Sequence, residues 1–93
     1  MSNLFTNHFY INLSEREDRK QNAIEQLSKL GIVPNRMGAI KTEMGIVGCA
    51  LSHLRCIQEA KIKRYPYVCI FEDDIIIKNE NLLIKKVKKL INE

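Results

Sequence analysis

The chain has 93 residues, of which 45% are hydrophobic and 28% are charged, and its formal net charge is +4. This length suits one small domain, and the composition is that of a globular protein, not a disordered one. No stretch approaches the roughly 20 consecutive apolar residues of a membrane span, and the first residues show no basic segment followed by an apolar run. We therefore expect one domain over residues 1–93, located in the cytoplasm.

Cysteines and lysines narrow the class of protein further. Cys49, Cys56 and Cys69 are an odd number, which indicates reduced thiols and not a disulfide framework. Much of the basic excess lies between Lys85 and Lys89, too local to predict nucleic-acid binding. This segment could contact a membrane surface weakly, but a solvated helix face is the simpler interpretation.

The first third of the chain predicts a strand followed by a helix. Residues 8–13 alternate, with Phe9, Ile11 and Leu13 on one face, as in a β-strand. Ser14 is the expected N-cap of the helix, and Gly31 its end. The helix should bury an apolar stripe made of Ala23, Ile24, Leu27 and Leu30.

The middle of the chain repeats this pattern. Residues 36–41 predict a weaker strand, and Thr42 is the expected cap of a second helix that ends before Pro66. The apolar face of that helix is expected to comprise Ile46, Val47, Ala50, Leu51, Leu54, Ile57 and Ala60.

The last third predicts a buried strand and a final helix. Residues 67–71 form a continuous apolar run, typical of a parallel strand that is covered on both faces. Asn79 or Asn81 begins the helix that follows. The order β-α-β-α-β-α predicts an α/β fold with a parallel sheet, about half of a doubly wound domain. A second copy of the chain could cover the open edge of such a sheet.

The acidic cluster Glu72-Asp73-Asp74 directly follows the third predicted strand. Ligands of open parallel sheets bind at the carboxyl ends of the strands. Carboxylates two residues apart, together with a diphosphate, supply the hard oxygen ligands that Mn²⁺ or Mg²⁺ prefers. Three acids in a solvated turn are the alternative, but acids between two apolar segments lose solvation unless a cation or hydrogen-bond donors compensate them.

The second predicted helix carries several polar residues. Cys49, His53 and Cys56 share one helix face, but a zinc site would need a fourth ligand, so buried cysteines and a structural histidine are the simpler interpretation. Gly48 permits a close backbone approach. Ser52 alone indicates no nucleophile, because no Gly-x-Ser-x-Gly motif surrounds it.

Four segments together carry a family resemblance, and they occur in the family's order and spacing. They are Tyr10-Ile11-Asn12-Leu13 with Asp18-Arg19, Arg36 to Ile40, Gly48-Cys49-Ala50-Leu51-Ser52-His53, and Ile70-Phe71-Glu72-Asp73-Asp74. The chain resembles glycosyltransferase family 25, which includes bacterial lipooligosaccharide galactosyltransferases and the collagen galactosyltransferases. The third and fourth segments, about twenty residues apart, are the specific part of the resemblance.

The resemblance implies a GT-A-like fold, a UDP-sugar donor (often UDP-galactose), Mn²⁺ or Mg²⁺, and transfer to a hydroxyl of a saccharide acceptor. By position, Glu72 and Asp74 would hold the metal, and Asp73 would lie at the diphosphate. The resemblance places Asn12 and Arg19 near the donor, and Ser52 and His53 in or behind the pocket wall. It assigns no catalytic base.

Length sets the expectation for activity. Family members usually have a catalytic domain more than twice as long, so the resemblance implies that residues 1–93 carry the donor- and metal-binding half. A non-catalytic module that keeps the fold and binds the nucleotide sugar is the alternative. A receiver domain is a third interpretation, but its acidic pair would follow the first strand, where this chain has Asn12-Leu13-Ser14.

Overall fold

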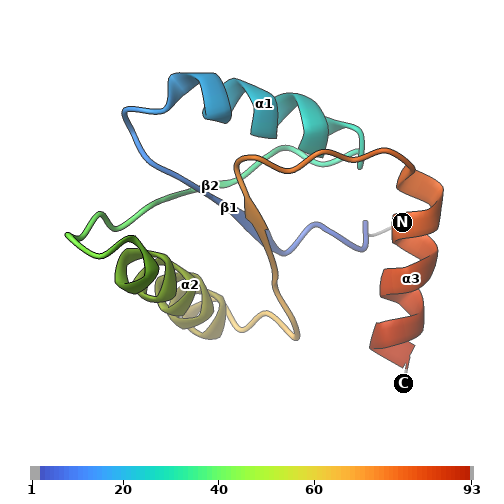
Figure 1. Cartoon of the computed structure of the whole chain (residues 1–93). Coiled ribbons are helices and arrows are strands. Elements are labelled where there is room, and N and C mark those ends of the chain that lie inside the picture. The colour runs from blue at the N-terminus through green and yellow to red at the C-terminus, as the bar shows by residue number, and fades with distance from the viewer. Residues whose placement is uncertain (1–2, 93) are drawn as a thin grey trace.

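The computed structural model describes residues 3–92, and it confirms the predicted order of elements. The elements are β1 (His8–Asn12), α1 (Glu17–Ser28), β2 (Arg36–Gly38), α2 (Gly45–Ile62), β3 (Cys69–Glu72) and α3 (Glu80–Asn92). The three strands form one parallel sheet in the order β2-β1-β3 (Figure 1). The fold is therefore α/β and Rossmann-like, consistent with the predicted GT-A-like half domain.

Strand β1 is the centre of the sheet. Tyr10 pairs with Arg36 of β2 and with Phe71 of β3, so β1 has a hydrogen-bonded neighbour on each side. The outer strands each have one neighbour within the described residues. Accordingly His8, Phe9, Tyr10 and Asn12 are buried, whereas the residues of β3 are half-buried or exposed. The prediction that residues 67–71 are covered on both faces is confirmed in part: Cys69 and Phe71 pack against the cluster around Tyr10 and Ile70 against the cluster around Phe9, but all are only half-buried.

Two apolar clusters lie on the two faces of the sheet. On one face, α1 buries Ala23 and Leu27 against Tyr10, and α3 contributes half-buried Leu83 and Val87. The predicted stripe of the first helix is thereby confirmed, since Ile24 is half-buried and Leu30 buried as well. On the other face, α2 packs Cys56 and Ala60 against Phe9.

The helix ends differ from the prediction in two places. Helix α1 begins at Glu17 after Arg16, and α2 begins at Gly45 after Met44, and neither N-cap residue makes a side-chain capping bond. Ser14 and Thr42 are therefore not the caps, because both lie too far upstream of the first turn. Asn79 does cap α3, since its Oδ1 accepts a hydrogen bond from Leu82 N at 3.0 Å.

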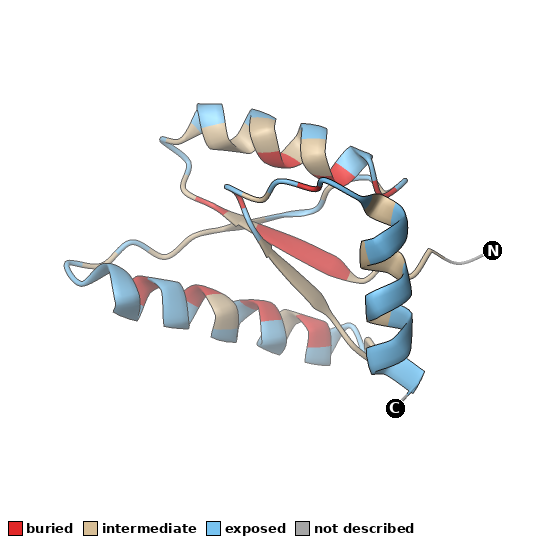
Figure 2. Ribbon diagram, turned by 45° about the vertical axis from the view of Figure 1, so that its right-hand side comes forward, coloured by how far each residue is buried: buried red, intermediate tan, exposed pale blue. Residues whose placement is uncertain are grey.

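Helix α2 contradicts the predicted apolar face. Its buried residues are small and occur at every fourth position: Gly48, Ser52, Cys56 and Ala60. Of the seven residues predicted to be buried, only Ala60 is; Leu54, for example, is 49% exposed. Small residues allow α2 to lie close to the sheet, whereas its larger apolar side chains are exposed. Figure 2 shows buried and exposed positions alternating along this helix.

The remaining predictions concern membranes and thiols. Over residues 3–92, no helix has the length and apolar character needed to cross a membrane. Cys49 is a free thiol at the surface, Cys56 is free and buried, and Cys69 is free and half-buried. Helix α1 ends at Ser28 with Lys29 as its C-cap, so Gly31 is not, as was predicted, the residue directly after the cap; it adopts a left-handed φ of 73° in the turn that follows.

Candidate functional site

A cavity of about 290 Å³ lies at the carboxyl ends of the three strands. The chain leaves β1 through α1 on one face of the sheet and reaches β3 through α2 on the other face (Figure 1). The gap between β1 and β3 is therefore the point at which the connections change sides, where open α/β sheets bind their ligands. Residues from four segments line the cavity. They are Ile11, Leu13, Arg16 and Arg19 around the β1–α1 turn, Ala39 to Thr42 after β2, Gly45, Gly48, Cys49, Ser52 and His53 in α2, and Glu72 to Asp74 at the end of β3.

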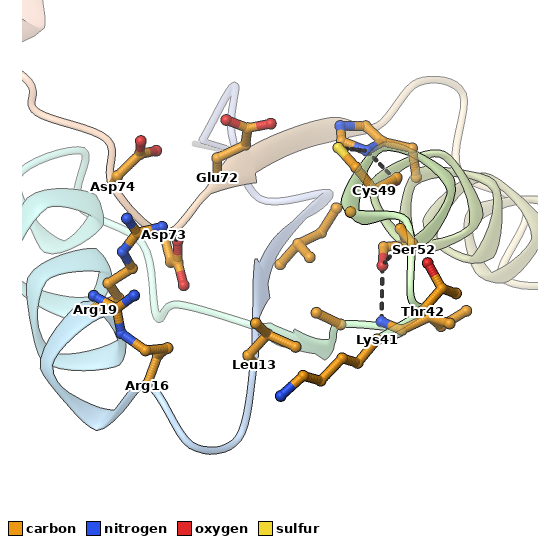
Figure 3. Close-up of a pocket in the computed structure, with 16 residues that line it drawn as sticks. Leu13, Arg16, Arg19, Lys41, Thr42, Cys49, Ser52, Glu72, Asp73 and Asp74 are labelled. Carbon is orange, nitrogen blue, oxygen red and sulfur yellow. Dashed lines mark hydrogen bonds and ion pairs between the residues drawn. The ribbon is translucent and has the colours of Figure 1, made fainter.

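The acidic cluster divides into two kinds of carboxylate. Glu72 and Asp74 are exposed, whereas the side chain of Asp73 is only 12% exposed. Figure 3 shows Glu72 and Asp74 projecting to one side of the backbone and Asp73 to the other. The two aspartates lie in a turn that follows β3, closed by Ile75 N donating to Glu72 O at 3.2 Å. All three line the cavity.

Asp73 is held in place by neighbours from α1 and β1. Its Oδ2 accepts a hydrogen bond from Asn12 Nδ2 at 2.9 Å, and its Oδ1 lies 3.5 Å from Arg19 Nη1. Its backbone carbonyl accepts a bond from Asn22 Nδ2 at 3.0 Å, and the same amide donates to Ile75 O. The β3–α3 loop is thereby anchored to α1, which leaves the two exposed carboxylates free to face a ligand.

Asn12 is the buried junction behind this site. Besides Asp73, its Nδ2 donates to Arg16 O at 3.1 Å. Arg36 Nε donates to its Oδ1 at 3.0 Å, and Arg36 Nη2 to its carbonyl at 2.9 Å. Asn12 is 1% exposed and is not among the residues that line the cavity. It links the end of β1 to the Arg36 side chain of β2 and to Asp73 after β3. Direct contact of Asn12 with a donor stays a prediction.

Three cations line the same cavity: Arg16, Arg19 and Lys41. Arg16 forms two bonds to Asp18, at 3.0 and 2.9 Å, and this guanidinium lowers the pKa of Asp18 to about 2. Lys41 Nζ lies 2.7 Å from Glu15 Oε1, and the bond raises the pKa of Lys41. Figure 3 shows Arg16 and Lys41 across the cavity from Glu72 and Asp74.

Only Arg19 of these three cations was identified from the sequence. Arg16 precedes Arg19 by three residues, a spacing that puts both on one side of the first helical turn. Lys41 lies three residues after the end of β2, in the loop at the carboxyl end of that strand, as Asp73 and Asp74 lie at the carboxyl end of β3. Treating all three strand ends alike would have found both residues.

Ser52 and Gly48 hold the cavity wall formed by the β2–α2 loop. Ser52 Oγ donates to Gly48 O at 2.7 Å and accepts from Ile40 N at 2.9 Å, and the residue is 1% exposed. A Cβ atom on Gly48 would lie 2.5 Å from Ile40 O, so only glycine permits this approach. Ser52 lines the cavity, but its hydroxyl is already engaged, so a direct bond to a donor stays a prediction.

His53 and Cys49 lie side by side on the cavity side of α2. His53 Nδ1 is 2.9 Å from Cys49 O and 3.8 Å from Cys49 Sγ. A carbonyl only accepts, so this bond puts the proton on Nδ1 and leaves Nε2 as an acceptor. Cys56, the third residue of the hypothetical zinc face, is buried under Phe9 and away from this pair.

The side chains at this site supply some, but not all, of the ligands that a divalent cation needs. Among residues 3–92, no three His, Cys, Asp or Glu side chains are gathered so as to hold a metal ion. Glu72 and Asp74 supply exposed carboxylate oxygens, which Mn²⁺ and Mg²⁺ accept. The protein residues therefore fit such an ion when the oxygens of a bound diphosphate complete its coordination.

Comparison with known proteins identifies one family. The sequence model of glycosyltransferase family 25, described as an LPS biosynthesis protein, matches residues 43–93, which is more than half of the chain. The match covers Ser52, His53 and the acidic cluster, whereas Asn12 and Arg19 precede it. Neither the curated proteins nor the solved structures yield a match.

Proposed function

Since the chain belongs to glycosyltransferase family 25, we propose that its cavity binds a nucleotide-sugar donor for transfer of a sugar to a saccharide hydroxyl. The proposed donor is a UDP-sugar, with galactose as the first candidate sugar. One observation carries this proposal. The cavity at the β1–β3 switch point is lined by exposed carboxylates on one side and by cations on the other.

A sugar diphosphate matches this division of charge. The phosphates carry negative charge, which Arg16, Arg19 and Lys41 can neutralise through charge-assisted hydrogen bonds. The N-terminus of α2, an 18-residue helix that begins at Gly45, also faces the cavity and adds a positive dipole end. A Cβ atom placed on Gly45 would have no neighbouring atom within 4 Å, so there is space for a phosphate to approach the backbone there.

Glu72 and Asp74 are the proposed metal ligands. A bound Mn²⁺ or Mg²⁺ would neutralise the charge that develops on the leaving nucleoside diphosphate. Asp73 acts differently, because Asn12 and Arg19 hold its carboxylate. Its proposed role is to fix the β3–α3 loop, so that the carboxylates on either side of it are already oriented when the donor enters.

Donor binding is the part of the reaction that these residues support. Transfer also needs an acceptor hydroxyl held in line with the donor carbon and, usually, a general base. With Glu72 and Asp74 assigned to the metal and Asp73 to the loop, His53 is the candidate general base in the cavity wall. Its Nε2 is an acceptor. We therefore expect residues 1–93 alone to bind the donor and to hydrolyse it slowly, with transfer below about one turnover per second.

Thermal unfolding with added ligands tests donor binding. A ligand at 100 times its Kd stabilises the native state by about 2.7 kcal/mol. Millimolar Mn²⁺ and UDP together should therefore raise the Tm by several degrees, and more than either alone. Asp74→Asn should keep its fold and lose the metal-dependent part of this shift. Glu25→Gln, at an exposed position of α1 outside the cavity, is the matched control and should keep it.

An unchanged melting curve of the wild type with Mn²⁺ and UDP would refute donor binding. Product analysis then separates an enzyme from a binding module. The chain is incubated with UDP-galactose or UDP-glucose and Mn²⁺, with and without glucosyl or N-acetylglucosaminyl acceptors. Release of UDP in the absence of acceptor, lost in Asp74→Asn, supports the enzymatic interpretation. A Tm shift without any turnover identifies the non-catalytic module.

A further inference from the structure

The segment that connects β3 to α3, orange in Figure 1, is held by side chains of helix α1. Asn22 Nδ2 donates hydrogen bonds to the carbonyls of Asp73 and Ile75, both at 3.0 Å. One helical turn later, Gln26 Oε1 accepts a bond from Ile77 N at 2.8 Å. Residues four positions apart lie on the same side of a helix, so both amides face this segment. Both also lie outside the lining of the cavity.

The backbone on both sides of Asp74 is fixed by hydrogen bonds. The peptide group before it is held through Asp73 O, which accepts from Asn22. The peptide group after it is held through Ile75 N, which donates to Glu72 O and closes the turn. Because both peptide groups are planar and held, the two backbone dihedral angles of Asp74 are set, and with them the direction of its Cα–Cβ bond. The exposed carboxylate of Asp74 therefore leaves the backbone in a defined direction.

An asparagine suits this position because its side-chain amide carries two N–H groups. One N–H bonds the carbonyl before Asp74 and the other bonds the carbonyl of the residue after it, so a single side chain joins two points of the turn. Residues 73–79 belong to no helix or strand, so the turn depends on such contacts for its order. A carboxylate on an unordered turn would lose backbone freedom on binding a cation, and this loss would weaken the binding.

We propose that Asn22 is a positioning residue for the metal: from α1 it holds the backbone around Asp74, so that the carboxylate is directed at the cation before the cation binds. This role rests on the proposed function, in which Asp74 binds Mn²⁺ or Mg²⁺ beside the diphosphate of the donor. Because Asn22 lies outside the cavity lining, it acts through Asp74 and not on the ligand. Gln26 holds the segment farther on, at Ile77, and contributes to stability alone.

UDP binding with and without Mn²⁺ tests this role. Isothermal titration calorimetry of the full chain gives the Kd of UDP in Mn²⁺ and in EDTA, and the ratio of the two is the metal-dependent gain in affinity. Asn22→Ala should lower this gain about three- to tenfold, less than the roughly 10- to 100-fold typical of a group that bonds the side chain of a metal ligand directly. The Kd in EDTA should change little.

Gln26→Met is the matched control on the same face of α1. It replaces the amide by a side chain of similar length and loses the bond to Ile77 N. Urea unfolding should show that Gln26→Met and Asn22→Ala are both destabilised, because each loses a hydrogen bond to the same segment. Only Asn22→Ala should lower the metal-dependent gain.

A second comparison separates positioning from stability. In an Asp74→Asn background the carboxylate that Asn22 directs is gone, so adding Asn22→Ala should change the metal-dependent gain by less than about twofold. The same addition should lower the urea midpoint in both backgrounds. Circular dichroism verifies folding. If Asn22→Ala is unfolded, Asn22→Ser, which keeps a hydroxyl donor at this position, takes its place and should change the gain in the same direction.

Three results would overturn the positioning role. Equal gains in Asn22→Ala and Gln26→Met would show that Asn22 contributes stability alone, and they would leave donor binding untouched. Effects of Asn22→Ala and Asp74→Asn that add in full would show that Asn22 does not act through Asp74. A wild type whose affinity for UDP gains nothing from Mn²⁺ would remove the proposed metal site, and the role of Asn22 with it.

Discussion

The two helices that cover the sheet pack by opposite rules. Helix α1 buries large side chains such as Leu27 and leaves a polar outer surface, whereas α2 buries Gly48, Ser52, Cys56 and Ala60. The difference follows from what each helix must do at the cavity. Helix α1 contributes long cations from its first turn, while α2 brings its backbone and the β2–α2 loop close together. Apolar area stabilises the α1 side, and close fit stabilises the α2 side.

The largest difference in stability should come from shortening an apolar side chain on α1 and one on α2, which lie on opposite faces of the sheet. Leu27 is fully buried and Leu54 is 49% exposed. Leu27→Ala should lower the free energy of unfolding by about 2–5 kcal/mol, since it leaves a cavity in the core. Leu54→Ala should change it by less than about 0.5 kcal/mol, as surface substitutions do. Urea unfolding at low chain concentration measures both, and similar losses would contradict the contrast between the helices.

The second-largest effect should come from removing side-chain hydrogen bonds on the α1 side and on the α2 side of the sheet. Asn12→Ala removes bonds to Asp73, Arg16 and Arg36, two of which involve charged groups, and should cost about 2–3 kcal/mol. Ser52→Ala removes bonds to two backbone groups and should cost about 1 kcal/mol. The same urea titration compares them. If Ser52→Ala proves the more damaging, the α2 side depends on polar contacts more than its geometry indicates.

Two glycines of α2 test the close approach directly. A Cβ on Gly48 would lie 2.5 Å from Ile40 O, whereas Gly45 has open space. Gly48→Ala should therefore destabilise the fold by about 1–2 kcal/mol through overpacking and weaken the Mn²⁺–UDP shift. Gly45→Ala should be neutral or stabilising by up to about 0.5 kcal/mol. Equal stabilities of the two variants would mean that the β2–α2 loop yields without cost.

The smallest effect should be a loss of stability of the folded state at acid pH. Arg16 lowers the pKa of Asp18 to about 2, below its ordinary value of 3.8. The ion pair therefore stabilises the fold above about pH 4, and this contribution is lost as the pH falls from there toward 2. Asp18→Asn should lack it, so the stability difference from wild type should vanish near pH 2. The pair is exposed, so the difference should be small and should disappear in high salt. Unfolding curves from pH 7 to pH 2 measure it.

The sequence predicted the order of elements because strand and helix periodicities differ strongly in this chain. It predicted the buried face of α1 for the same reason. It failed for α2 because both sides of that helix are apolar or small, and periodicity alone does not say which side the sheet takes. The stripe of small residues four positions apart was the signal available.

The candidate site was predictable where it depends on strand ends, and less so where it depends on contacts. The position of Glu72 and Asp74 after a strand follows from their place in the chain. The burial of Asp73, by contrast, depends on Asn12, which lies 61 residues earlier. No local pattern reveals such a pairing. Arg16 and Lys41 were missed because the acidic cluster after β3 was the only strand end considered for charged ligand contacts, although both residues line the same cavity.

The long sequence separation between Asn12 and Asp73 also bears on how the molecule is made. Strand β1 is synthesised early, but each of its partners in β3 follows 61 residues later, after all of α2. Closing so long a loop is costly in entropy before its contacts form, and non-local parallel pairing of this kind slows folding. The cavity is complete only once residue 74 has been synthesised, because Glu72, Asp73 and Asp74 form part of its wall. Its assembly is therefore expected to be a late event in folding, and a stalled or prematurely released chain would expose β1 to aggregation.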